Sequence, residues 1–290
     1  KPANAGFDGR LSIDRAGLRL AEAELAVGDV QIQAAGVVGM RPDLEGSQLQ
    51  LSVSGPQLAA LAPYLRGVEL PAVPFTLTGE VEVSKGSYLL NEVSAEVEGS
   101  RVEVDGVLIP GNGLVGTDLD VEVAAANLRC AGDLVAGLVS LPELPSEPLL
   151  LTSGLQKDEG PGWVIDDLSV ALAGASAAVN GRIGSWPDLA GTELTIDGGG
   201  PEASVLRSLP GLENLPQAPF SVCGGVKLTP EGFELEALDL RLGDLRLESD
   251  GIVGAPPHLI GTDLTFELTG GRSALLGALI GMDSFVDEPF

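Results

Sequence analysis

Residues 75–83, Phe-Thr-Leu-Thr-Gly-Glu-Val-Glu-Val, decide the fold class of this chain. Apart from Gly79, apolar residues occupy the odd positions, whereas Thr or Glu occupies each even position. Successive side chains of a β-strand point to opposite faces, so the segment predicts a strand with one apolar and one polar face. Residues 101–105, 118–123, 239–242 and 263–268 repeat the pattern. Short Gly-bearing turns such as residues 85–87 separate the strands, which favours antiparallel hairpins.

Three sequence anchors recur about every 70 to 75 residues, a long period for a repeat protein. A Leu-Pro-x-x-Pro-Phe segment at 70–75 returns in variant form at 144–149, 215–220 and 285–290. A Gly-ended loop occurs at 42–46, 113–116, 187–191 and 257–261. The third anchor is a glycine that we expect to close an alternating strand: Gly36, Gly106, Gly181 and Gly251.

These anchors predict a mainly β protein, an array of antiparallel β-repeats. The expected units are residues 1–74, 75–148, 149–219 and 220–288, and residues 289–290 would be the start of a truncated fifth unit. We expect about four strands in each unit. One short helix per repeat is expected at 56–65, 127–141, 202–209 and 273–280, because each stretch ends at Gly or Pro.

Composition excludes several classes of protein. The 290 residues include 16 Lys and Arg against 42 Asp and Glu, a net charge of −26 that repels nucleic acid. No apolar run approaches the roughly 20 residues of a membrane-spanning helix. The chain starts at Lys1 with no signal peptide, so we expect a mature or excised segment of a longer protein.

The sequence offers little material for catalysis or for metal binding. The single histidine, His258, falls in a predicted surface turn, and Cys130 and Cys223 lie in different repeats, with Cys223 on the predicted polar face. Nucleophile-elbow, zinc-protease, phosphate-loop, dinucleotide and EF-hand patterns do not occur. We therefore predict a protein that is not an enzyme, with no catalytic residues, no metal and no cofactor.

The apolar strand faces need a partner. About sixteen strands spaced roughly 4.8 Å apart present far more apolar area than short helices can cover. Either the sheet folds into a sealed sandwich, or it curls into a long groove with an apolar interior. The residues expected to line such a groove are Phe75, Leu77, Val81, Val83, Val102, Val104, Leu119, Val121, Val123, Leu149, Leu151, Val179, Leu194, Ile196, Phe220, Val222, Leu240, Leu242, Leu264, Phe266 and Leu268.

The order of the motifs resembles the repeats of the AsmA family. The resemblance is carried by Pro-Asp-Leu-x-Gly-x-x-Leu-x-Leu within 42–53 and, with Ile as its last residue, at 187–196, by Gly-Pro at 55–56 and 200–201, and by the proline segments at 70–75 and 215–220. It implies a bridge-like lipid-transfer protein built from repeating β-groove units. Such units are usually described with five strands, and the membrane helix of the family lies outside this sequence.

The resemblance implies phospholipid transport in the periplasm of a Gram-negative bacterium, in support of outer-membrane biogenesis. The expected partners are phospholipid acyl chains, further repeats of the same longer chain and, through termini outside this sequence, the membranes. Inner-membrane anchoring through a segment outside this chain is also implied. The alternative is a structural or adhesive β-repeat rod with a sealed core.

Overall fold

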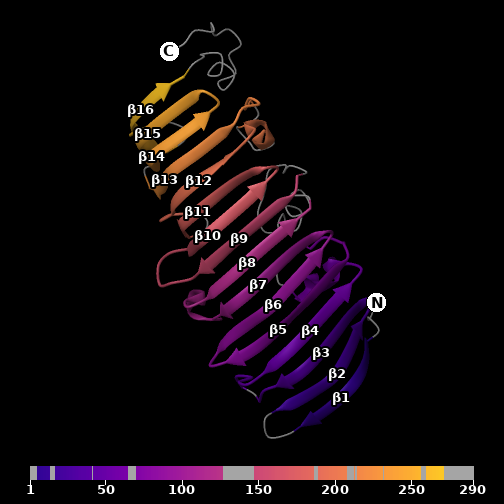
Figure 1. The fold of residues 1–290 in the computed structure, drawn as a ribbon. Coiled ribbons are helices and arrows are strands. Elements are labelled where there is room, and N and C mark those ends of the chain that lie inside the picture. Colours follow the sequence, from indigo (N-terminus) through magenta and orange to yellow (C-terminus); the bar gives the residue numbers. More distant parts are fainter. Residues whose placement is uncertain are drawn as a thin grey trace. The chain divides into compact units, whose positions relative to one another are not determined.

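The computed structural model describes residues 5–13, 17–40, 42–64, 70–126, 147–185, 189–207, 212, 214–230, 232–255 and 259–270. It divides into two compact units, Lys1–Leu141 and Pro142–Phe290. The chain is mainly β, and Figure 1 shows the strands following one another in chain order within each unit. The expected helices at 127–141 and 273–280, together with Cys130 and His258, lie outside the described residues.

The first unit holds an antiparallel sheet in which each strand pairs with the next one in the chain. Its described strands are β1 (Ala5–Ile13), β2 (Leu18–Val27), β3 (Val30–Val38), β4 (Gln48–Gly55), β5 (Phe75–Ser84), β6 (Ser87–Val97), β7 (Ser100–Leu108) and β8 (Asp118–Ala125).

The second unit repeats this arrangement. Its described strands are β9 (Leu149–Gln156), β10 (Trp163–Leu172), β11 (Ala175–Ile183), β12 (Glu193–Gly200), β13 (Phe220–Thr229), β14 (Gly232–Leu242), β15 (Leu245–Gly254) and β16 (Asp263–Thr269). Strands β5, β9 and β13 begin at Phe75, Leu149 and Phe220, the residues at which the sequence period was divided, so each repeat contributes four described strands.

The strand ends of each sheet form two opposite rows, joined by the connections between strands. We call each row of strand ends an edge; the word does not refer here to the outermost strands. We call the edge with the β1–β2, β3–β4, β5–β6 and β7–β8 connections, and their counterparts in the second unit, the turn edge. The opposite edge carries the 3-10 helices η1 (Leu58–Tyr64) in the first unit and η3 (Ala203–Leu206) in the second, and we call it the helix edge. A single helical turn, η2 (Asn112–Leu114), belongs to the β7–β8 connection of the turn edge.

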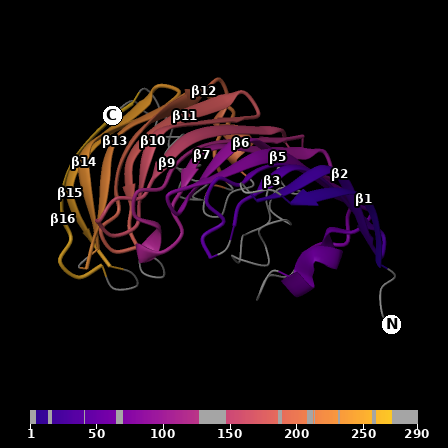
Figure 2. The same cartoon turned by 90° about the horizontal axis from the view of Figure 1, so that it is seen from below.

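Short helices therefore occupy two of the four positions at which the sequence predicted them. The proline segment holds each one in the same way: the Leu58 N–H donates to the Val73 carbonyl at 2.7 Å, and the Ala203 N–H donates to the Ala218 carbonyl at 2.7 Å. In Figure 2, η1 lies beneath the strands of the first unit. Its Leu58 and Leu61 pack against the buried cluster of Val30, Phe75 and Val97.

The sequence predicted that a glycine ends one strand of each repeat. This is wrong, because the strand continues past the glycine. Gly36, Gly106, Gly181 and Gly251 lie within β3, β7, β11 and β15, at φ between 122° and 134°. A Cβ at Gly181 would lie 2.1 Å from the Glu193 carbonyl oxygen of β12. The glycine is therefore required by the close approach of the next strand and by its backbone conformation.

The second strand of every repeat contains a β-bulge, which the sequence analysis did not predict. The strand register shifts in β2, β6, β10 and β14, at the residues Glu22, Glu92, Asp167 and Ala237, each with φ near 50°. A bulge adds one residue to the strand, so the apolar parity changes there. In β6, Tyr88 and Leu90 precede the bulge and Val93, Ala95 and Val97 follow it, all on one face.

A short turn also recurs at the turn edge between the third and fourth strands. The hydroxyl of Ser47, Thr117, Thr192 or Thr262 accepts the backbone N–H of Gly39, Ile109, Gly184 or Gly254, at distances of 2.8 to 3.0 Å. The same hydroxyls of Thr192 and Thr262 donate to the carbonyls of Leu189 and Leu259 at 2.7 Å. In each repeat this hydrogen bond joins the two ends of the turn and so stabilises the connection between the third and fourth strands.

Candidate functional site: the apolar face of each sheet

Strand register places the apolar residues of each unit on one face. Directly paired residues share a face in an antiparallel sheet. In the first unit one such row reads Leu25, Ile32, Val53, Leu77, Ala95, Val102 and Val123. In the second unit the corresponding row reads Leu151, Val170, Ala177, Gly198, Val222, Leu240, Leu247 and Leu268.

All of the residues expected to line a groove lie on these two apolar faces. In the first unit they are Phe75, Leu77, Val81, Val83, Val102, Val104, Leu119, Val121 and Val123. In the second unit they are Leu149, Leu151, Val179, Leu194, Ile196, Phe220, Val222, Leu240, Leu242, Leu264, Phe266 and Leu268. The faces also include residues of the bulged strands, such as Leu90, Val93, Leu168 and Leu235, which the sequence analysis missed. In β6 the sequence marks them by two consecutive polar residues, Asn91-Glu92. Residues of the apolar face occupy even positions before this pair and odd positions after it.

The apolar faces are only partly covered. Of the expected lining residues, Phe75, Val83 and Leu242 are buried, Phe266 is exposed, and the others are half-buried. In the described parts of the chain, extensive contacts between elements join only strands that are neighbours in sequence. A sealed sandwich would instead bury the inner-facing side chains of two stacked sheets. Within the described residues, no second sheet lies over either apolar face.

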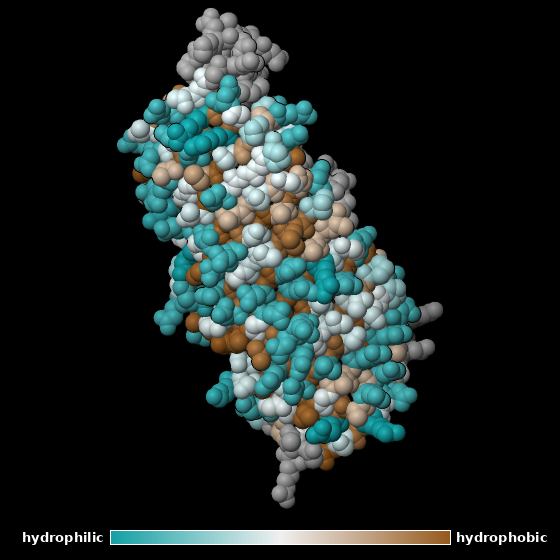
Figure 3. Space-filling model, in the orientation of Figure 1, coloured by the Kyte–Doolittle hydropathy of each residue, from teal (hydrophilic) through white to brown (hydrophobic). Residues whose placement is uncertain are grey.

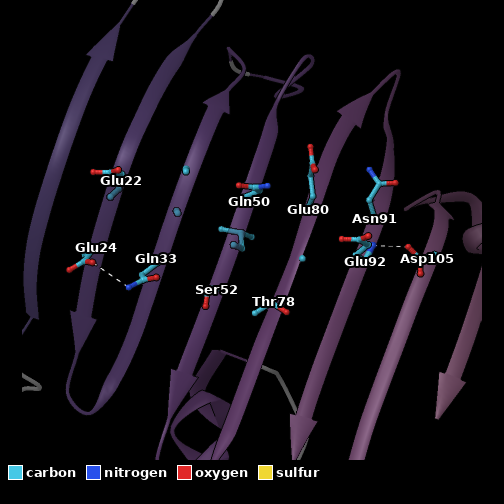
Figure 4. Close-up of a pocket in the computed structure, with 15 residues that line it drawn as sticks. Glu22, Glu24, Gln33, Gln50, Ser52, Thr78, Glu80, Asn91, Glu92 and Asp105 are labelled. Carbon is cyan, nitrogen blue, oxygen red and sulfur yellow. Dashed lines mark hydrogen bonds between the residues drawn. The ribbon is translucent and has the colours of Figure 1, made fainter. Parts of the chain in front are cut away.

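The opposite face is polar and strongly acidic. In the first unit it holds an open hollow of about 890 Å³, drawn in Figure 4, with the carboxylates of Glu22, Glu24, Glu80, Glu92 and Asp105 among its lining groups. None of the residues lining the hollow is cationic, so an anion finds no oppositely charged partner there. No cluster suited to a metal ion occurs among the described residues. Figure 3 shows hydrophilic side chains spread over the strands, with hydrophobic patches between them.

Polar side chains on this face hold the bulges. The Glu92 N–H donates to Asp105 at 2.6 Å, the Asp167 N–H to Asn180 at 2.7 Å, and the Ala237 N–H to Asp250 at 3.1 Å. The acceptor always stands immediately before the third-strand glycine. In the first repeat that position is Ala35, which offers no side-chain acceptor. The change of parity is therefore fixed by contacts between the second and third strands of three repeats.

Ion pairs lower the pKa of two carboxylates in the second unit, Asp158 in the β9–β10 connection and Asp239 on the polar face of β14. A hydrogen bond from Arg182, supported by the Gly160 N–H, lowers the pKa of Asp158 from 3.8 to about 2. The Arg246 guanidinium, followed by that of Arg241, holds the pKa of Asp239 well below its usual range. Both aspartates stay ionised at neutral pH, which suits a solvated outer surface.

Cys223 lies on the polar face, as expected, where it is exposed and free. Among the described residues, no helix is long and apolar enough to cross a membrane. In comparisons with known proteins, no family model, no curated protein and no solved structure gives a significant match to this chain.

Proposed function

We propose that this chain is a segment of a bridge-like, AsmA-like lipid-transfer protein and that it holds phospholipid acyl chains against the apolar face of each sheet. One observation carries the proposal: the described part of each unit presents a wall of half-buried aliphatic side chains with no second sheet over it. Hydrocarbon chains are suitable occupants, because each CH₂ removed from water contributes about 0.8 kcal/mol.

The dimensions of the face support this occupant. Eight strands at roughly 4.8 Å give each sheet a length of about 38 Å, and a strand of ten residues spans about 33 Å. One leaflet of a bilayer supplies tails of about 15 Å, half of a hydrocarbon core about 30 Å thick. Several tails therefore fit on the face of one unit. We also propose that each sheet curls into a groove with an apolar interior and that every repeat carries one short helix.

The proposed setting is the periplasm of a Gram-negative bacterium, between inner and outer membranes, with the membrane anchor and further repeats in other parts of a longer chain. The acidic polar face favours this role, because a surface of high net charge keeps an exposed sheet soluble. A rod with a sealed core is less well supported, because it would bury the side chains that are half-exposed here.

Two adjacent residues of β8 provide the test. Val121 lies on the apolar face, directly opposite Val104, and Glu122 lies on the polar face, opposite Glu103. We expect Val121→Asp to lose the phospholipid that co-purifies with the wild-type chain, measured by native mass spectrometry, because lipid would trap the carboxylate against hydrocarbon. Glu122→Arg introduces a cation opposite Glu103 and should retain the lipid.

The free energy of unfolding of Val121→Asp distinguishes an open apolar face from a sealed core. Without lipid, the new carboxylate of Val121→Asp on an open face reaches water, so we expect a loss of only about 1–2 kcal/mol in the free energy of unfolding, chiefly lost apolar burial. A charge forced into a sealed core would cost about 3–5 kcal/mol. Unfolding by Val121→Asp, or a wild-type chain that carries no lipid under gentle conditions, would contradict the proposed function.

A further inference from the structure

The two edges of each apolar face differ in burial. Buried apolar side chains concentrate at the helix edge, where each of the following is at most 8% exposed: Val30, Phe75, Val97 and Ala125 in the first unit, and Ala175, Ala203, Leu242 and Leu245 in the second. Large apolar side chains at the turn edge include five that are at least 36% exposed: Met40, Ile183, Phe233, Leu259 and Ile260.

The helix edge is closed by chain that folds back onto the apolar face. Leu58 and Leu61 of η1, with Val73 of the proline segment, pack on the cluster of Val30, Phe75 and Val97. In the third repeat, Ala203 of η3 is 1% exposed and its N–H is bonded to the proline segment. The chain therefore covers the apolar face at this edge beside η1 and η3.

In the described part of the chain, the turn edge has little cover of this kind. Its recurrent turns satisfy their own hydroxyl and backbone groups and stay compact. Val83 and Ile165 are exceptions among the apolar side chains near this edge: both are buried, and the Val83 backbone is hydrogen-bonded to Gly46 and Ser47 of the preceding turn. Ile183 and Phe233, which pair with Trp163 and Leu228, continue the apolar face to this edge.

We propose that the turn edge is the open edge of the lipid-binding face, along which phosphate-bearing head groups lie, while the tails extend toward the closed helix edge. The inference rests on the proposed function and adds the orientation of the bound lipid. It follows from two requirements: the phosphate must remain hydrated or paired with a cation, and the tail end must be shielded from water.

The two ends of β6 offer matched probe sites. Lys85 and Glu98 both have φ of 50°, and each is followed by a glycine in a tight turn, at the turn edge and the helix edge respectively. Single cysteines from Lys85→Cys and Glu98→Cys, in a chain carrying Cys130→Ser and Cys223→Ser, would bear a bimane fluorophore. The full chain would be loaded with phosphatidylcholine carrying a nitroxide either on the head group or at the tail terminus.

We expect the head-group nitroxide to quench bimane at position 85 at least twofold more than at position 98, and the tail nitroxide to give the reverse order. Equal or inverted quenching in a chain that carries the lipid would overturn the orientation and leave the proposed function intact. Absence of quenching at both positions, with no lipid eluting with the chain, would overturn the proposed function itself.

Discussion

Gly181→Ala tests whether the third-strand glycine is required by the neighbouring strand. Gly181 in β11 has φ of 134°, and a Cβ there would lie 2.1 Å from the Glu193 carbonyl oxygen, whereas real Cβ contacts essentially never fall below 3.0 Å. The β11–β12 pair would have to separate locally by about 0.9 Å. Backbone strain of about 1–3 kcal/mol adds to overpacking of about 1–3 kcal/mol, so we expect a total loss of about 2–6 kcal/mol.

Gly174→Ala is the matched control in the turn that precedes the same strand. Gly174 also has positive φ, 86°, but a Cβ there meets nothing within 4 Å. This variant carries the backbone strain without the clash, and we expect a loss of about 1–2 kcal/mol. The difference between the two variants isolates the close approach of β12.

Urea unfolding followed by tryptophan fluorescence is a suitable assay, because Trp163 lies in β10 of the second unit. Trp163 pairs with Ile183, two residues from the substituted glycine. If Gly181→Ala unfolds at the same urea concentration as Gly174→Ala, the clash does not exist and the explanation for the recurring glycine is wrong.

Three further predictions concern polar groups of the repeats. Thr192→Val removes the hydroxyl that accepts the Gly184 N–H at 2.9 Å, so it should cost about 1–3 kcal/mol in urea unfolding, whereas Thr192→Ser should be nearly neutral. Asp158→Asn should reduce the acid sensitivity of stability: the pKa of Asp158 is lowered to about 2 by Arg182, so its contribution is present above pH 4 and is lost as the pH falls toward 2. A variant whose urea midpoint declines as steeply as that of the wild type between pH 5 and 2 would contradict this. Ala35→Asn should supply the acceptor that the other repeats provide to the bulge N–H, and raise the free energy of unfolding by about 0.5–1.5 kcal/mol; an unchanged urea midpoint would show that the bulge needs no such partner.

The strand faces and the repeat were predictable from the sequence because they depend on local properties. Alternation in segments such as residues 75–83 assigns each residue to a face before any partner strand is known. Recurrence of the proline segment located the first residues of β5, β9 and β13. The acidic surface likewise follows from composition, since few cations are present to balance it.

The bulges, the position of the glycines and the difference between the edges were decided by tertiary structure. The parity change at Glu92 is held by Asp105 from another strand, and the need for Gly181 comes from a carbonyl of β12. Burial at the helix edge depends on η1 folding back onto Phe75. Alternation assigns a side chain to a face, but what lies against that face depends on chain remote in sequence, so the sequence left the sealed sandwich and the open groove as alternatives. The structure leaves the apolar faces of the described units half-exposed, because each strand is satisfied by hydrogen bonds to its chain neighbours and no second sheet of the described residues lies over either face.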